Sequence, residues 1–140
     1  MKIIFVDTDK TFSKEFEESF KRTNRVTTFP EMFEAYKWMK ADENTPDIIV
    51  TEIDLYQPTG LQSLKFLLTK SKLKNTYIVG FTQHSMSESE KKLILSEGAS
   101  EVFEKNKLVS GFSAYLKFLS DPNIKQKSSD KKFSEKGKSK

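Results

Sequence analysis

The chain has 140 residues, no cysteine and a formal net charge of +4. The length predicts one domain with a single sizeable core, and the lack of cysteine excludes disulfides and thiolate metal sites. No apolar run approaches the roughly 18 residues needed to span a bilayer, and the apolar run before Asp7 is too short for a signal peptide. We therefore expect a cytoplasmic protein with no membrane partner.

The positive charge is concentrated at the C-terminal end. Residues 121–140 contain seven lysines and three acidic residues, whereas residues 1–120 contain equal numbers of basic and acidic side chains. We predict one domain over residues 1–120 and a basic, disordered tail over 121–140, because the tail has few apolar side chains to bury. A lysine-rich tail can contact nucleic acid, but this tail has no arginine and a single aromatic residue, which favours a solubilising end.

Short strands and helices are predicted to alternate through the first 120 residues. Apolar runs predict strands, and apolar residues that recur every three or four positions predict amphipathic helices. In chain order, the predicted elements are strand 2–6, helix 11–22, strand 25–29, helix 30–40, strand 47–53, helix 60–71, strand 76–82, helix 87–97, strand 100–105 and helix 108–119. Strict alternation of this kind predicts a parallel sheet with helices on both faces.

Several residues support these boundaries and faces. Pro30 is placed to begin the second helix, Ser87 and Glu90 form a capping box for the fourth, and Gly98 suits the position after its last turn. Gly80, within a predicted strand, indicates close packing against it. The residues predicted to share one face of their helix are Phe12, Phe16 and Phe20; Met32, Tyr36 and Met39; Leu61, Leu64 and Leu68; and Phe112, Tyr115 and Leu119.

Polar side chains follow four of the five predicted strands at the point where each one ends. They are Asp7, Thr8 and Asp9 after the first strand, Glu52 and Asp54 after the third, Thr82 after the fourth and Lys105 after the fifth. The carboxyl ends of parallel strands meet at one edge of a sheet, so these side chains should lie close together. Carboxylates suit Mg²⁺, while a hydroxyl and an ammonium suit phosphate oxygens.

These residues and their spacing resemble the receiver domain of two-component response regulators. The resemblance covers residues 2–119 and rests on the stretches IIFVDTD, PDIIVTE followed by Gly60, IVGFTQ and EGASEVFEK, in that order. It implies a flavodoxin-like α/β fold, with a five-stranded parallel sheet of order 2-1-3-4-5 sandwiched by five helices. It also implies bacterial phosphorelay signalling rather than enzymatic activity.

The departures from the family pattern fall at the site itself. Glu52 matches the position of the aspartate phosphoacceptor, and Thr8 replaces the second of two acids, of which Asp7 is the first. Val102 stands at the position of the aromatic switch residue. By resemblance, Asp7, Glu52 and Asp54 would form a weak Mg²⁺ site at best, with Asp54 contributing its backbone carbonyl.

The departures suggest a pseudo-receiver, which signals by protein contact without being phosphorylated. Glutamate moves the carboxylate by about one methylene, and a shift of about 1 Å costs on the order of 10²-fold in a reaction that depends on positioning. The Glu52 carboxylate would instead approach Lys105 and Thr82, the equivalents of the phosphate-contacting residues, as a partial phosphoryl mimic. The alternative is a phosphorylatable receiver in which Asp9 or Asp54 supplies the missing ligand or accepts the phosphoryl group.

The resemblance also implies a protein partner, either a histidine kinase or a separate effector. In receivers the partner surface usually combines the fourth helix, fifth strand and fifth helix, here about residues 87–119, and the same surface allows a homodimer. Exposed Lys91, Lys92 and Lys107 are expected there and would suit an acidic partner. His84 is interpreted as a solvated loop residue, because no second histidine accompanies it.

Overall fold

Five parallel strands form the sheet that organises the molecule, in the spatial order β2-β1-β3-β4-β5. The computed structural model describes residues 1–41, 44–56 and 60–121. The strands are β1 (Lys2–Val6), β2 (Arg25–Phe29), β3 (Ile48–Glu52), β4 (Tyr77–Thr82) and β5 (Glu101–Glu104). The predicted strand order and flavodoxin-like architecture are confirmed.

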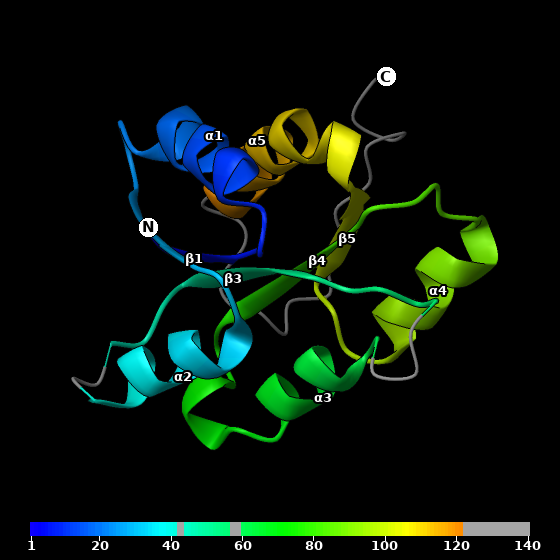
Figure 1. Cartoon of the computed structure of the whole chain (residues 1–140), viewed down its shortest axis with the longest axis horizontal. Coiled ribbons are helices and arrows are strands. Elements are labelled where there is room, and N and C mark those ends of the chain that lie inside the picture. Colours follow the sequence, from blue (N-terminus) through cyan, green and yellow to red (C-terminus); the bar gives the residue numbers. More distant parts are fainter. Residues whose placement is uncertain (42–43, 57–59, 122–140) are drawn as a thin grey trace.

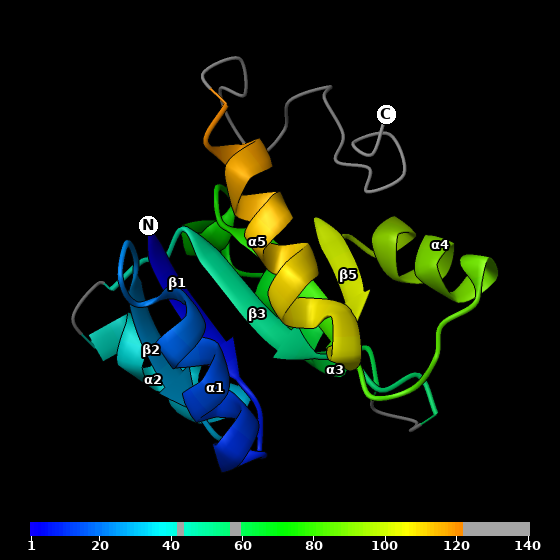
Figure 2. The ribbon, with the colours of Figure 1, turned by 90° about the horizontal axis from the view of Figure 1, so that it is seen from above.

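Helices cover both faces of this sheet. They are α1 (Lys10–Phe20), α2 (Met32–Ala41), α3 (Gln62–Leu68), α4 (Glu88–Ser96) and α5 (Leu108–Leu119), with short 3₁₀ helices η1 (Ser71–Leu73) and η2 (Lys105–Lys107). Helices α1 and α5 lie side by side on one face, and α2, α3 and α4 lie on the other (Figures 1 and 2). This is the three-layer sandwich predicted from strict alternation.

Alternation within each strand divides the core between the two faces. Ile3 and Phe5 pack under α1 and α5, whereas Ile4 and Val6 pack against α2, α3 and α4. Successive side chains of a strand point to opposite sides of the sheet, so a strand buried on both faces must be apolar throughout. The α1–α5 face is strongly aromatic: the Phe5 ring stacks on Phe16 with centroids 4.2 Å apart.

Two local predictions differ from the structure. Helix α3 is only seven residues long and buries Leu64 and Leu67, while Leu68 is 40% exposed. Leu68 lies over Gly98, whose φ of +116° places it beyond the end of α4, so the predicted inward face was wrong by one position. Pro30 precedes α2, which begins at Met32.

Other boundary signals agree with the structure. Ser87 accepts a hydrogen bond from the Glu90 amide, and the Glu90 carboxylate accepts one from the Ser87 amide, which is the predicted capping box. Of the predicted basic tail over 121–140, residues 122–140 lie outside the described residues. In the part of the chain that the structure describes, no helix combines the length and apolar character needed to cross a bilayer.

Candidate functional site

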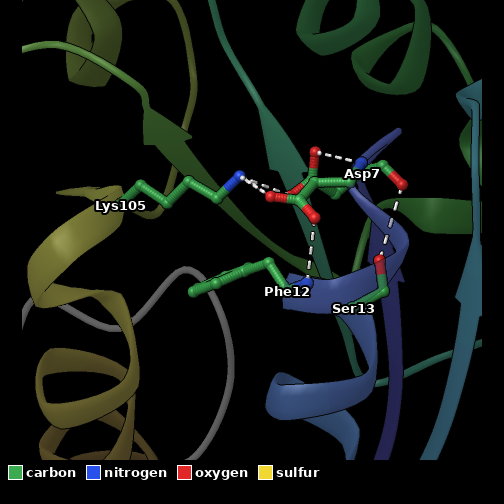
Figure 3. Close-up of polar contacts among 5 residues, drawn as sticks. Asp7, Phe12, Ser13 and Lys105 are labelled. Atoms are coloured by element: carbon green, nitrogen blue, oxygen red, sulfur yellow. Dashed lines mark hydrogen bonds and ion pairs between the residues drawn. The ribbon is translucent and has the colours of Figure 1, made fainter.

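Asp7 lies at the base of the site, immediately after β1. The residue is 3% exposed, and its amide donates to the carbonyl of Phe29 at 3.1 Å. One carboxylate oxygen, Oδ1, accepts a hydrogen bond of 3.2 Å from the Asp9 amide. The Ser13 hydroxyl donates to the Asp7 backbone carbonyl at 3.5 Å (Figure 3). Contacts from both flanking segments therefore fix this acid in place.

Lys105, the first residue after β5, reaches across the strand ends to Asp7. Its Nζ lies 3.0 Å from Asp7 Oδ2 and 3.2 Å from Asp9 Oδ2 (Figure 3). Asp7 Oδ2 is buried and accepts no well-aligned hydrogen bond among the described residues, so the ammonium is what compensates its charge. Burial disfavours the charged amine, but the carboxylates of Asp7 and Asp9 outweigh that effect and raise the pKa of Lys105.

Glu52, the last residue of β3, is half-buried and has no ion pair among the described residues. The expected Glu52–Lys105 pair is not formed, because the ion pairs of Lys105 run to Asp7 and Asp9 on the β1 side. The partial phosphoryl mimicry that this pair would have provided is likewise not seen.

Glu52 instead faces an open depression of about 260 Å³ at the carboxyl edge of the sheet. We call this hollow the acidic depression. Its lining residues are Val6, Asp7, Thr8, Pro30, Glu31, Met32, Thr51, Glu52, Asp54, Gly60 and Ser63. Four of the predicted residues therefore come together here: Asp7, Thr8, Glu52 and Asp54. Asp9, Thr82 and Lys105 do not line the depression.

The donors around the acidic depression do not fit a resident Mg²⁺ ion. Within the described ranges, no group of three or more histidine or acidic side chains converges closely enough to hold a metal. Asp7 is engaged through both oxygens, and Asp54 Oδ1 accepts a hydrogen bond of 2.9 Å from the Tyr56 amide. Thr8 offers a hydroxyl where a second charged oxygen would be needed for tight binding of a hard cation.

Thr82 ends β4 and is buried, but its hydroxyl points along its own loop. Oγ1 donates a hydrogen bond of 2.8 Å to the backbone carbonyl of His84. The exposed His84 ring packs edge to face against Tyr56, with centroids 4.8 Å apart. The structure thus agrees with a loop histidine and adds a contact between the β3–α3 and β4–α4 connections that sequence patterns did not indicate.

Comparison with known proteins identifies the family. The model for the response regulator receiver domain matches residues 3–110. The chain belongs to this family. It is a receiver-domain protein of two-component signalling, and receivers are typically signalling domains rather than catalysts. No curated protein matches the chain significantly.

Solved receiver structures share the fold at low sequence identity. The BeF₃-activated N-terminal receiver domain of Klebsiella pneumoniae RstA is 23% identical, with a TM-score of 0.68, over 84% of this chain and 97% of that one. The receiver domain of the Francisella response regulator 1452 is 21% identical, with a TM-score of 0.68, over 84% and 94%. A Thermotoga maritima response regulator is 12% identical, with a TM-score of 0.69, over 84% and 95%.

Val102, which the resemblance places at the aromatic switch position, is closely packed. Val102 is 1% exposed and belongs to the cluster packed under α2, α3 and α4. Beneath it lies Gly80, where any Cβ would meet Ile53 and lie 3.5 Å from a Val102 methyl group. A small, fully packed side chain therefore occupies this position.

The role of Asp9 was only partly visible in the sequence. Its side chain accepts a hydrogen bond of 3.0 Å from the Phe12 amide, as expected of an acid at a helix start. The same carboxylate pairs with Lys105 through its other oxygen. The residue order did place both side chains at the carboxyl edge of the sheet, but nothing in the spacing selected Asp9 over Glu52 as the partner of Lys105.

Proposed function

We propose that this receiver signals by protein–protein contact and does not accept a phosphoryl group at Glu52. The observation that carries this proposal is the position of Lys105. Its ammonium lies 3.0 and 3.2 Å from Asp7 and Asp9, whereas the half-buried Glu52 side chain has no ion pair with any described residue.

The nucleophile itself argues for the same conclusion. Phosphoryl transfer depends almost entirely on positioning and on electrostatic stabilisation of the transferred group. Glu52 carries its carboxylate one methylene farther from the backbone than aspartate does, and a displacement of about 1 Å is enough to cost about 10²-fold. In the acidic depression this carboxylate also shares the space with Glu31 and Asp54, whose charges repel an incoming phosphoryl donor.

The contacts that would stabilise a phosphoryl group in this site are also less favourable. Thr8 removes one carboxylate from the expected cation site, and Asp7 already has Lys105 as its counter-charge. We therefore expect Mg²⁺ to bind weakly. The Thr82 hydroxyl is engaged by His84, so it would have to break a hydrogen bond before it could contact a phosphoryl oxygen.

Signalling then depends on the surface formed by α4, β5 and α5, about residues 87–119. Lys92 and Leu93 are exposed on α4, the latter by 46%. Lys91 is less available than predicted, because its Nζ lies 3.8 Å from the carboxylate of Glu101. The Lys107 side chain is 69% exposed, as predicted, although its Nζ lies 4.0 Å from Glu104. An acidic surface on a histidine kinase, on an effector or on a second copy of the chain would suit the remaining charge.

Incubation with a small-molecule phosphodonor and Mg²⁺ tests the proposal, with intact-protein mass spectrometry as the measurement. We expect no mass gain for the native chain. The variant Thr8→Asp/Glu52→Asp restores the acidic pattern of the family and is the matched positive control. Calorimetric titration with Mg²⁺ should give a stronger signal for this variant than for the native chain. Phosphorylation mapped to Glu52 of the native chain contradicts the proposal.

One observation favours a second possibility, a receiver phosphorylated at a neighbouring acid. Asp54 lines the acidic depression together with Asp7 and Glu52. However, its Oδ1 accepts a hydrogen bond from the Tyr56 amide, which stabilises the turn after β3. The same labelling experiment separates the two functions, because a mass gain that is lost on Asp54→Asn supports the second.

A further inference from the structure

An ion pair between residues 96 positions apart joins the start of α1 to the end of β5. Asp9 Oδ2 lies 3.2 Å from Lys105 Nζ, and the lysine side chain is only 14% exposed. Most ion pairs between surface side chains contribute little, because two long side chains must be ordered in water. The surroundings of this pair distinguish it from that general case.

Asp9 is held in place by two backbone hydrogen bonds. Its Oδ1 accepts from the Phe12 amide at 3.0 Å, which caps α1, and its own amide donates to Asp7 Oδ1 at 3.2 Å. One carboxylate oxygen therefore serves the helix and the other faces Lys105. Because the carboxylate is ordered by the fold, little further conformational entropy is lost when Lys105 pairs with it.

An aromatic ring lies beside the Lys105 ammonium, in addition to the carboxylates of Asp7 and Asp9. Its Nζ lies 4.7 Å from the centroid of the Phe12 ring, within the range of a cation–π contact. Figure 3 shows the lysine extending toward Asp7 above the start of α1, with Phe12 beside it. Two carboxylates and the Phe12 ring thus surround the ammonium from residues 7–12, and the Phe81 ring of β4 lies farther off, with its centroid 5.9 Å from Nζ.

We infer that Asp9 is a positioning residue: its charge holds Lys105 on the β1–α1 connection and away from Glu52. Asp7 alone would offer the ammonium a single carboxylate on the β1 side, and Asp9 adds a second one there. This inference rests on the proposed function, because it explains how the Lys105 ammonium is kept from Glu52 at the acceptor position. An anion entering the acidic depression would have to draw Lys105 away from both acids.

The test measures the reactivity of the Lys105 amine toward reductive methylation, followed by peptide mass spectrometry. Amines react in the neutral form, so carboxylates that stabilise the ammonium protect it. In Asp9→Asn, which removes the charge but keeps a good N-cap, we expect Lys105 to react roughly two- to fivefold faster, in line with the modest strength of partly exposed pairs. Glu18→Gln is the matched control, because it removes a carboxylate of α1 that pairs with Lys21 at 2.8 Å.

A second substitution separates charge from helix capping. Asp9→Glu keeps the carboxylate but caps a helix less well, so the inference predicts that Lys105 stays protected in this variant. If Asp9→Asn does not fold, Asp9→Ser offers a second capping residue without charge. The inference is overturned if the protection of Lys105 from methylation follows the capping ability of residue 9 rather than its charge. It is also overturned if the methylation rate is unchanged in Asp9→Asn and Asp9→Ser.

The outcome is independent of phosphorylation. Amine reactivity needs no phosphodonor, so the role of Asp9 can be confirmed even if the native chain proves to accept a phosphoryl group. Conversely, the native chain could resist phosphorylation while the methylation rate of Lys105 does not change in the Asp9 variants. That result would leave the proposed function intact and contradict this inference. A further readout is available in the Thr8→Asp/Glu52→Asp background, where adding Asp9→Asn should speed labelling by the phosphodonor by a similar factor.

Discussion

The hydroxyl of Thr82 donates a hydrogen bond of 2.8 Å to the carbonyl of His84. This contact closes the turn that leaves β4 and brings the His84 ring against Tyr56, with centroids 4.8 Å apart. In a receiver, the residue at this position is expected to contact the phosphoryl group. Here the hydroxyl is engaged within its own loop, so we expect its contribution to appear as folding stability.

Substitution of Thr82 by valine tests this role. Thr82 is 7% exposed, and Thr82→Val removes the donor while keeping the shape, so we expect a loss of about 1 kcal/mol in the free energy of unfolding. Thr69→Val is the matched control, because its exposed hydroxyl also donates to a backbone carbonyl, that of Phe66 at 2.7 Å, and water can replace it. Urea denaturation measures both. Equal losses in the two variants would show that the buried turn has no special role.

Gly80 is required by the side chain that packs against it. A Cβ at this position would meet the Cδ1 atom of Ile53, a fully buried side chain. We expect Gly80→Ala to destabilise the protein by about 1–3 kcal/mol, as overpacking does. Ile53→Val deletes that Cδ1 atom, so the double variant should lose less stability than the sum of the two single variants. Strict additivity in urea denaturation would mean that this contact is not the cause.

Lys91 and Lys92 are neighbours on α4 with different surroundings. Lys91 Nζ lies 3.8 Å from the carboxylate of the buried Glu101, whereas Lys92 is exposed and has no ion pair in the described part of the chain. Because the Lys91 side chain is 34% exposed, we expect Lys91→Gln to cost no more than about 1 kcal/mol in unfolding free energy. Lys92→Gln should stay within about 0.5 kcal/mol of the native chain. Adding salt should reduce the difference in unfolding free energy between the two variants. A larger loss of stability for Lys92→Gln than for Lys91→Gln would contradict the pairing of Lys91 with Glu101.

Sequence patterns predicted the fold well because they report on burial over many residues. The run from Ile3 to Val6 is apolar at every position, as expected of a strand that is covered on both faces. The structure places its alternate side chains in the two cores. Boundaries were less accurate. Leu68 and Leu67 differ by one helical position, and the choice between them depends on how a seven-residue helix meets Gly98.

The candidate site was predicted as a set of residues but not as a set of contacts. Strand order alone brings Asp7, Glu52 and Lys105 to one edge of the sheet. Which acid Lys105 selects depends on side-chain reach and on the helix start that orders Asp9. Such a choice between neighbouring acids leaves no periodic signal in a sequence.

The pKa of Asp9 provides a pH-dependent test of the same arrangement. The hydrogen bond from the Phe12 amide, followed by the contact with Lys105, holds the pKa of this carboxyl below its ordinary value of 3.8. A lowered folded-state pKa stabilises the protein at pH values above 3.8, and that contribution is lost as the pH falls through the lower, folded-state value. The Phe12 amide resonance reports the protonation of Asp9 directly, so NMR should show its titration midpoint below 3.8.

Lys105→Met separates the two causes of this shift. The substitution keeps an unbranched side chain but removes the ammonium, so the Asp9 midpoint should rise toward 3.8 while the Phe12 hydrogen bond keeps it from reaching that value. Glu18 serves as the internal control, because its pKa is lowered by Lys21 at the C-terminal cap of the same helix and should not respond. An Asp9 midpoint that is unchanged in Lys105→Met would mean that the two side chains do not pair in solution, and the explanation of the uncompensated Glu52 would then have to be sought elsewhere.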